Sequence, residues 1–322
     1  MTGMVGQVGI VCKVCLWICS IIVLSMPSLS VIIPTHRRPE ILKTCLEHLE
    51  KQTIVNDIEV IVVSDGGDDE SQVVRHKSPA FACGLRTGRQ VTTRFLEIAP
   101  CHQGVARNEG VKVAQGKYVM FIGDDIFLTE DACAKHVQSY TLRLASLTQG
   151  ESFATLGFTT WDPACGITPM MRWLEISGWQ FGYPQIEKFS HNFLPRDIQH
   201  KYTYTSHISL PIEIAKKFPF RSDVSLYGWE DVEWGMRLRD AGVPLFYEPS
   251  AIALHHHHIT LDDSLKRMQT LGRSAVEIQK KVPEFDRVPR GWKLLAYRIC
   301  ALFPAMAGSH RRAFLRGLGV DS

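Results

Sequence analysis

The chain has 322 residues, a formal net charge of +3, 45% hydrophobic residues and 21% charged residues. These values are typical of a globular protein with one large domain or two, and they exclude a disordered chain. The small net charge, without a dense stripe of Lys and Arg among aromatic residues in the body of the chain, gives no indication of a nucleic-acid partner.

Residues 1–27 form an apolar N-terminal segment. Val14 to Met26 is apolar apart from two serines and follows Lys13, as in the core of a signal peptide or a short anchor. The run is shorter than the roughly 18–20 apolar residues of a spanning helix, and a predicted strand begins at Leu29 with almost no stem before it. We therefore favour an extension upstream of a start at Met26 over a membrane anchor. Nine scattered cysteines favour reduced thiols and a cytoplasmic location.

Strand and helix patterns alternate from residue 29 onward. Runs of β-forming residues predict strands over 29–33, 58–64, 91–98 and 118–122. Helical spacing of apolar residues predicts helices over 40–52, after Pro39, and over 104–114. Because strands alternate with helices at this spacing, we expect βαβ units and a largely parallel sheet.

Two adjacent acids follow the strand predicted over 118–122. This strand is uncharged, so we expect it to be buried at the centre of the sheet. Asp124 and Asp125 then lie at its carboxyl end, where open α/β sheets bind ligands. Adjacent carboxylates repel unless they share a cation or a proton, which suits a divalent metal that carries substrate phosphates. The alternative is an Asp that caps a following helix, which we predict to open at Thr129.

The second half of the chain begins with an aromatic-rich region, residues 150–204. Such residues can stack on sugars, but packing in the core is commoner and is favoured here. Further strands are predicted over 203–210, 243–247 and 251–258, and a helix over 212–217.

A second acidic cluster marks a predicted helix that opens near Glu230 and ends at Gly242. Glu230, Asp231 and Glu233 would lie in its first turn, where the helix dipole favours acids. Ordinary N-terminal acidity is one interpretation. The other is a general base, since burial beside Trp229 would raise the pKa of a carboxyl group.

Four consecutive histidines occupy residues 255–258. On a strand, His255 and His257 would face one side and His256 and His258 the other. At most one pair could therefore join the acidic pair at a metal, and a structural role for all four is the alternative.

The C-terminal region, 261–322, is predicted to be a helical, basic extension of a domain that covers 28–260. Its Lys and Arg residues alternate with apolar residues from Pro283 onward. This pattern could lie on an anionic membrane surface, or it could pack on the domain with a solvated basic face.

Five motifs occur in an order that resembles family 2 inverting glycosyltransferases of the GT-A fold. They are SVIIPTHRR from residue 30, VVSDG from 62, GVARNEG from 104, FIGDDI from 121 and GWEDVEWGMRL from 228. The resemblance implies a Rossmann-like, mixed, mostly parallel sheet flanked by helices. It also implies a UDP-, GDP- or dTDP-linked sugar donor, held by Pro34, Thr35, Arg37, Asp65, Arg107 and Asp124.

The same resemblance assigns the two acidic clusters. Asp124 and Asp125 match the metal-binding DxD element, although Gly123 replaces its first acid, so that Asp125 is the firmest ligand for Mg²⁺ or Mn²⁺. His255 and His257 are further candidate ligands. Asp231 matches the catalytic base, with Glu230 beside it.

Alternative functions require motifs that the sequence contains to different degrees. A dehydrogenase is excluded because no GxGxxG follows the first strand. A metal-dependent phosphohydrolase and a non-catalytic nucleotide- or sugar-binding module remain alternatives. For a transferase we expect a glycan or lipid-linked acceptor in polysaccharide or cell-envelope biosynthesis, with peripheral contact at the inner face of a membrane.

Overall fold

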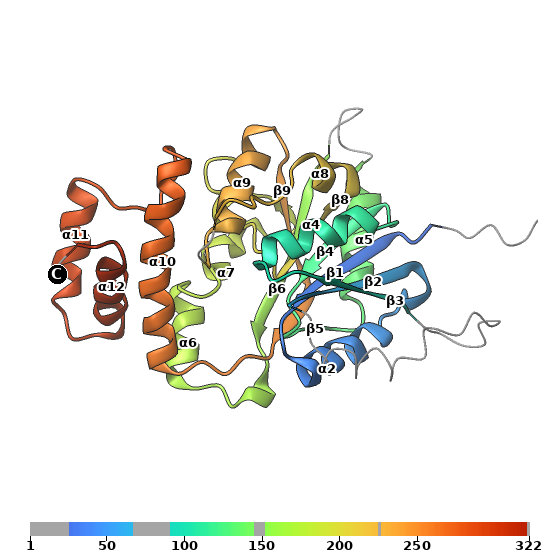
Figure 1. Cartoon of the computed structure of the whole chain (residues 1–322), viewed down its shortest axis with the longest axis horizontal. Coiled ribbons are helices and arrows are strands. Elements are labelled where there is room, and N and C mark those ends of the chain that lie inside the picture. Colours follow the sequence, from blue (N-terminus) through green and yellow to red (C-terminus); the bar gives the residue numbers. More distant parts are fainter. Residues whose placement is uncertain (1–25, 67–90, 145–151, 225–226, 321–322) are drawn as a thin grey trace, which may run out of the picture.

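The computed structural model describes residues 26–66, 91–144, 152–224 and 227–320 (Figure 1). Within these ranges a nine-stranded sheet has the order β3-β2-β1-β4-β8-β6-β9-β5, with β7 paired to β9. Nearly all of the predicted N-terminal segment lies outside the described residues. Among the described residues, no helix combines the length and the apolar composition that crossing a bilayer requires.

The elements have the following bounds. The strands are β1 (Leu29–Thr35), β2 (Ile58–Asp65), β3 (Thr92–Ile98), β4 (Tyr118–Ile122), β5 (Ile126–Leu128), β6 (Ala154–Trp161), β7 (Asn192–Phe193), β8 (His207–Pro211) and β9 (Leu245–His255). The helices are α2 (Pro39–Glu50), α4 (Gln103–Val113), α5 (Ala132–Leu144), α6 (Pro169–Ser177), α7 (Tyr183–Ile186), α8 (Ile212–Lys217), α9 (Glu230–Asp240), α10 (Leu261–Lys281), α11 (Trp292–Ala301) and α12 (Met306–Gly317).

The predicted α/β fold class is confirmed. Strands β1, β2, β3, β4, β6 and β9 run in one direction, and the short β5, β7 and β8 run against their neighbours. Strand β4 lies between β1 and β8 and is buried along its whole length, as its uncharged sequence predicts. The acids that follow it therefore lie near the middle of the sheet edge.

Helices cover both faces of the sheet because strand side chains alternate between them. Leu29, Val31 and Ile33 of β1 pack in one core with α2 and α5. Ile32, which points the other way, packs in a second core with α4, α8 and α9. The two cores, one on each face of the sheet, fix the strand ends from which the acids follow.

The prediction that a helix opens at Thr129 is wrong. Strand β5 pairs with β9 just before this point, and the Thr129 amide donates to the Ile252 carbonyl. Helix α5 can begin only at Ala132, after the chain has left the sheet.

Two predicted strands, 243–247 and 251–258, are one strand, β9. Its register with β6 shifts between Gly157 and Phe158, opposite Pro249, which has no N–H to donate to a ladder. The apparent break in the sequence is thus a bulge within one strand. The strand predicted from Thr203 starts later, at His207, because the Thr203 hydroxyl donates to the Asp231 carbonyl and is held against α9.

A helical extension follows β9, as the sequence predicts. Helix α10 packs on α12, and α12 packs on α11, at the end of the molecule away from β3 (Figure 1). A capping box between Thr260 and Asp263 starts α10. The Gly272–Gly317 contact brings α10 and α12 close, since a Cβ on Gly272 would lie 2.3 Å from the Phe314 carbonyl oxygen.

Candidate functional site

A cleft of about 760 Å³ opens where β1, β2 and β4 end. Both acidic clusters face this one cavity. Its walls include the predicted site residues Pro34, Thr35, Asp65, Arg107, Asp124, Asp125, Glu230, Asp231, His255 and His257. Arg37 is not among the described residues that line it. The positive φ of Arg37, 51°, instead turns the chain so that Arg38 faces the cleft.

Asp124 is buried and receives two hydrogen bonds. The Thr35 hydroxyl donates to Oδ2 at 2.8 Å, and Arg38 Nη1 donates to Oδ1 at 2.7 Å. Burial raises the pKa of Asp124 to about 6, against the opposing effect of the Arg38 charge. Asp124 therefore fastens the β1 loop to the β4 loop.

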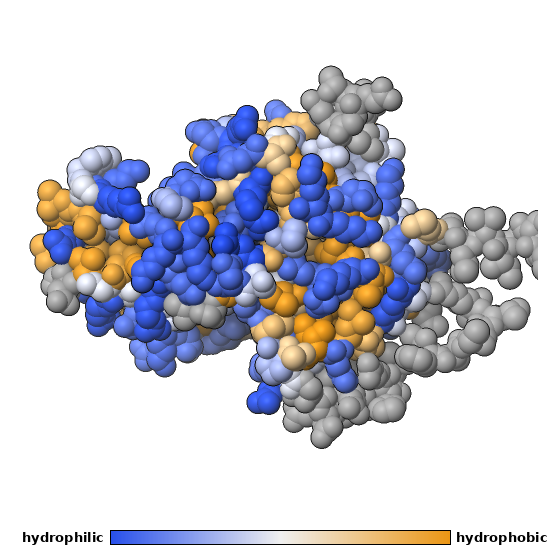
Figure 2. Space-filling view, turned by 45° about the horizontal axis from the view of Figure 1, so that its top comes forward, coloured by the Kyte–Doolittle hydropathy of each residue, from blue (hydrophilic) through white to orange (hydrophobic). Residues whose placement is uncertain are grey.

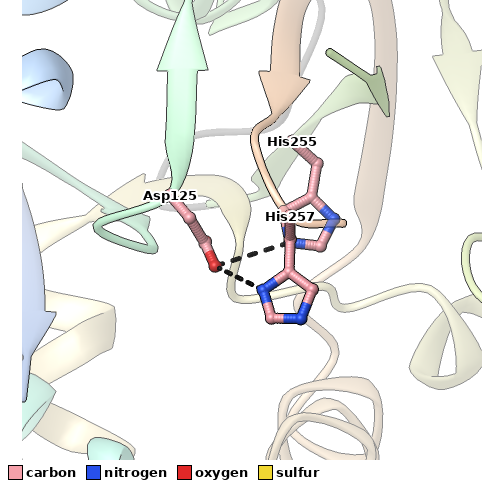
Figure 3. Close-up of side chains that lie close together, drawn as sticks. All are labelled: Asp125, His255 and His257. Atoms are coloured by element: carbon pink, nitrogen blue, oxygen red, sulfur yellow. Dashed lines mark ion pairs between the residues drawn. The ribbon is translucent and has the colours of Figure 1, made fainter. Parts of the chain in front are cut away.

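Asp125 is surrounded by cationic or cation-forming groups. Arg38 Nη2 lies 3.0 Å from its Oδ2, His255 Nε2 lies 3.6 Å away and His257 Nδ1 lies 3.4 Å away (Figure 3). Burial alone would raise the pKa of Asp125, but hydrogen bonds from the two histidines and the Arg38 charge hold it well below its usual range. The carboxylate stays ionised and points at both imidazoles.

The histidine run is arranged by the end of β9. The His256 amide donates to the Asp125 carbonyl at 2.8 Å, which fixes the β4 loop beside the strand end. His255 stacks on Trp161, with ring centroids 5.2 Å apart. His256 points the other way and lies 2.6 Å from Asp162. The predicted alternation is therefore confirmed for these residues, and it selects His255 and His257 as partners of Asp125.

Asp125, His255 and His257 form a group that fits a divalent metal. Their ligand atoms all lie within 4.8 Å of one another. One carboxylate and two imidazoles form a mixed oxygen and nitrogen set, which suits Mn²⁺ better than Mg²⁺, since Mg²⁺ prefers oxygen ligands. Arg38 now neutralises the same carboxylate, so a bound cation would share Asp125 with it or replace it.

The second acidic cluster opens helix α9. Trp229 adopts a left-handed conformation, φ 69°, and turns the chain into the helix so that Glu230 and Asp231 face the cleft. Burial and then the charge of Glu230 raise the pKa of Asp231 to about 6. Among the described residues, the Asp231 Oδ1 accepts a hydrogen bond from the adjacent Val232 amide alone, at 2.8 Å. Glu230 is held by the side chain of Gln103.

Arg107 of α4 lies behind these acids. It is 3% exposed, and its Nε and Nη1 atoms find no hydrogen-bond partner among the described residues. Burial lowers the pKa of Arg107, and the nearby charges of Glu230 and Asp231 oppose this effect. A buried guanidinium with unused donors is costly unless an anion completes it.

The nucleotide end predicted from the sequence lies at the ends of β1 and β2. Pro34 and Thr35 line the cleft, and Asp65 faces them. His36 Nδ1 lies 2.8 Å from Asp65 Oδ1, which ties the two strand ends together. The pKa of His36 is raised, mainly by its hydrogen bond to the Asp65 carbonyl oxygen at 2.7 Å and then by this contact with the Asp65 carboxylate.

Sequence reasoning missed several residues of the cleft. Arg38 occurs in one of the five motifs but was assigned no role. A role for Gln103 could not be predicted, because its contact with Glu230 joins distant segments. The aromatic-rich region was predicted to pack in the core, and Phe153, Trp161, Phe181 and Tyr183 are buried. Its other aromatic residues are only partly buried, and Trp179 and Phe181 also line the cleft. Arg267 of α10 lines it too.

Known sequences match the part of the chain that carries β1, β2 and β4. Residues 30–164 match the family described as Glycosyl transferase family 2. The putative glycosyltransferase EpsH of Bacillus subtilis is 30% identical over 115 residues, which cover 35% of this chain and 30% of EpsH. The poly(ribitol-phosphate) beta-glucosyltransferase of Bacillus spizizenii is 26% identical over 105 residues, 32% of this chain and 16% of that protein. The matches thus span less than a third of each relative.

Solved structures are similar over most of the chain. Residues 1–349 of S. aureus TarS, in complex with UDP-GlcNAc, have a TM-score of 0.52 at 16% identity, covering 91% of this chain and 80% of that fragment. The mannosyltransferase PcManGT from Pyrobaculum calidifontis, in complex with GDP-Man and Mn²⁺, has a TM-score of 0.54 at 14% identity, covering 91% and 75%. The fold is that of the GT-A class. The sequence similarity to glycosyl transferase family 2 covers residues 30–164.

Proposed function

We propose that this protein is an inverting, metal-dependent glycosyltransferase. It would move a sugar from a UDP-, GDP- or dTDP-linked donor to an acceptor hydroxyl. The observation that carries the proposal is that the Asp125 group and Asp231, with opposite pKa shifts, line one cleft. The glycosyltransferase relatives and the fold shared with proteins that bind UDP-GlcNAc or GDP-Man support it.

The donor would bind along the ends of β1 and β2. Pro34, Thr35 and Asp65 offer an apolar edge and oxygen acceptors for a base and a ribose. The unused donors of Arg107 suit an anion at the inner end of the cleft. In this arrangement the diphosphate lies between the nucleotide loop and α4.

Asp125, His255 and His257 would hold the divalent cation. When bound, such a cation neutralises the charge that develops on the departing diphosphate. The chain's own task is to keep Asp125 ionised and both imidazoles aimed at one point. Trp161 helps by stacking on His255, and the β4–β9 backbone bond helps by fixing the loop.

Asp231 would act as the general base. Its carboxylate takes the proton of the acceptor hydroxyl while the acceptor oxygen forms a bond to the anomeric carbon. The bond from that carbon to the diphosphate oxygen breaks, and the nucleoside diphosphate leaves with the electron pair. A pKa near 6 leaves Asp231 ionised at neutral pH yet basic enough to accept the proton. Glu230 raises that pKa by its charge.

The acceptor side faces the aromatic wall. Trp179 and Phe181 line the cleft, and their rings can stack on a sugar face. A glycan or lipid-linked acceptor in polysaccharide or cell-envelope synthesis fits this wall, and a peripheral position at the inner face of a membrane would bring a lipid-linked acceptor within reach.

Thermal shift with nucleotides tests the proposal. UDP, GDP and dTDP are each added with and without Mn²⁺, and one of them should raise the melting temperature only with the metal. The nucleotide sugar that carries this nucleotide should then be consumed, either by transfer of its sugar to an acceptor or by slow hydrolysis. Nucleotide binding without any turnover would favour the non-catalytic module. Release of inorganic phosphate from a phosphomonoester would favour the phosphohydrolase.

A further inference from the structure

Helix α11 and the two residues that follow it expose an apolar face. We define this face as Trp292, Leu295, Ile299, Leu302 and Phe303, whose exposed fractions lie between 50% and 78%. Figure 2 shows hydrophobic residues gathered beside hydrophilic ones at this end of the molecule. Large apolar side chains that cluster on a surface commonly mark a contact with a partner or a membrane.

The apolar face runs straight along the helix. At roughly 100° per residue its five members fall within an arc of about 100° on a helical wheel. Lys293 and Arg298 are exposed and flank this arc on opposite sides. Tyr297 and Ala301 point to the third side, against α12. A helix that lies in a membrane interface has this distribution: an apolar face toward the lipid, basic residues on both flanks of that face, and a polar or protein-contacting side opposite to it.

The charge around this face has one sign. Residues 287–320 contain seven Lys and Arg residues and no Asp or Glu. Such a basic segment is attracted to the negatively charged surface of a bilayer that contains anionic lipids. Trp292 at the start of α11 adds a side chain that favours the headgroup level.

The apolar face is rigidly presented. The Arg312 side chain of α12 donates to the carbonyls of Ala301 and Phe303, at the end of α11. Tyr297 of α11 lies against Phe314 of α12, with ring centroids 6.2 Å apart. The face is therefore exposed, while Tyr297 and Ala301 on the opposite side of α11 lie against α12.

We infer that α11 docks on an anionic lipid bilayer, with its apolar face in the headgroup region and its flanking cations on lipid phosphates. A second copy of this chain is the competing occupant. It is disfavoured because two such faces would bring Lys293 and Arg298 toward their own copies, and residues 287–320 offer no acid to pair with them.

This docking would also orient the cleft. Helix α10, which packs on α12, contributes Arg267 and Leu271 to the cleft wall, and Arg287 at the start of the acid-free segment lines it too. One helical unit thus carries both the lipid contact and a wall of the site. Resting on the proposed function, the acceptor class would be lipid-linked, with its sugar or hydroxyl presented at the membrane surface.

Vesicle co-sedimentation of the full chain tests the docking. Vesicles of phosphatidylcholine alone are compared with vesicles that contain a quarter phosphatidylglycerol. We expect binding to the anionic vesicles that weakens as salt rises. The double variant Leu295→Glu, Ile299→Glu should bind at least about tenfold more weakly, because it places charges where the acyl boundary would lie. Lys293→Gln with Arg298→Gln should lower the preference for anionic vesicles.

Leu142→Glu is the matched control, since Leu142 is also exposed but lies on α5. It should bind like the wild type. Anionic vesicles bound equally well by the Leu295→Glu, Ile299→Glu variant would overturn the inference. The inference would also be overturned if the wild type did not bind vesicles and light scattering showed that it is a dimer which this variant dissociates. Because binding needs neither donor nor turnover, these results are independent of the proposed reaction.

Discussion

The two ends of the cleft hold the same side chain in opposite electrostatic states. Asp125 lies among Arg38, His255 and His257, and these groups hold its pKa well below the usual range. The carboxylate of Asp231 is half-buried beside Glu230, and its one hydrogen-bond donor among the described residues is the Val232 amide, so that burial and the charge of Glu230 raise its pKa to about 6. One carboxylate is arranged to stay charged and the other to exchange a proton.

This difference divides the work of transfer between the ends. A permanently ionised Asp125 suits a cation, because protons compete poorly for it. Asp231 suits proton transfer, because a base works best when its pKa lies near the working pH. If the roles are divided in this way, changes at one end should alter metal and donor binding, and changes at the other should alter turnover alone.

Asp231→Asn should give the largest effect. We expect kcat to fall roughly 10²–10⁴-fold, since the base is lost while the shape of the side chain is kept. The donor affinity, measured by titration with Mn²⁺ present, should change little. Asp240→Asn on the same helix is the control, because Asp240 is exposed at the far end of α9 and pairs with Arg239. Normal turnover in Asp231→Asn would remove the base from the mechanism.

Asp125→Ala should act mainly on binding. The metal-dependent rise in melting temperature on adding the nucleotide should disappear, and kcat/KM should fall by about 10²-fold or more. The rise in melting temperature and the initial rate are measured over the same Mn²⁺ series. A variant that keeps the full Mn²⁺ response would show that the cation binds elsewhere.

The histidine run sharpens this test because its members face opposite sides. His257→Gln should weaken Mn²⁺ binding about 10–100-fold, as is common when a metal's ligand environment is disturbed. His256→Gln should leave Mn²⁺ binding at the Asp125 group unchanged, since His256 lies beside Asp162 and Cys165 instead. Isothermal titration of Mn²⁺ into each variant measures the difference. Equal losses in the two variants would mean that the histidines act only in folding.

The parts of this contrast that depend on neighbouring residues could be predicted from the sequence, and the parts that depend on contacts between distant residues could not. The strand before Asp124 and the helix that opens at Glu230 follow local patterns, and the structure confirms both. The alternation of His255 and His256 also follows from strand geometry.

Other features required the folded chain. Arg38 reaches the acids from a loop 86 residues away, and no local pattern encodes that contact. Gln103 meets Glu230 across a separation of 127 residues. The pKa values of Asp125 and Asp231 depend on burial, which the sequence suggested only for the second, from its neighbouring Trp residues.

The pH dependence should follow the Asp231 end of the cleft. With Mn²⁺ saturating, kcat/KM should fall about tenfold per pH unit below about 6, where Asp231 is protonated and cannot act as a base. The charge of Glu230 raises this pKa, so Glu230→Gln should move the acid limb of the profile to lower pH. An acid limb that does not move in Glu230→Gln would point to another titrating group.

Asp231→Asn should make the metal-free protein slightly more stable at pH 8. A carboxyl whose folded pKa is raised loses stability as pH rises from its unfolded pKa, near 3.8, to its folded pKa, about 6. An uncharged amide avoids that loss, which amounts to roughly 1–3 kcal/mol. We expect the melting temperature to rise by a few degrees at pH 8 and the gain to vanish below about pH 4.

Asp240→Asn again provides the contrast. Arg239 lowers the pKa of Asp240, so an amide there should give no gain at pH 8. Melting curves of both variants and the wild type from pH 4 to 8 measure the difference. A destabilised Asp231→Asn at pH 8 would mean that its charge is stabilised in the folded protein, as at Asp125, and the contrast between the two ends would be lost.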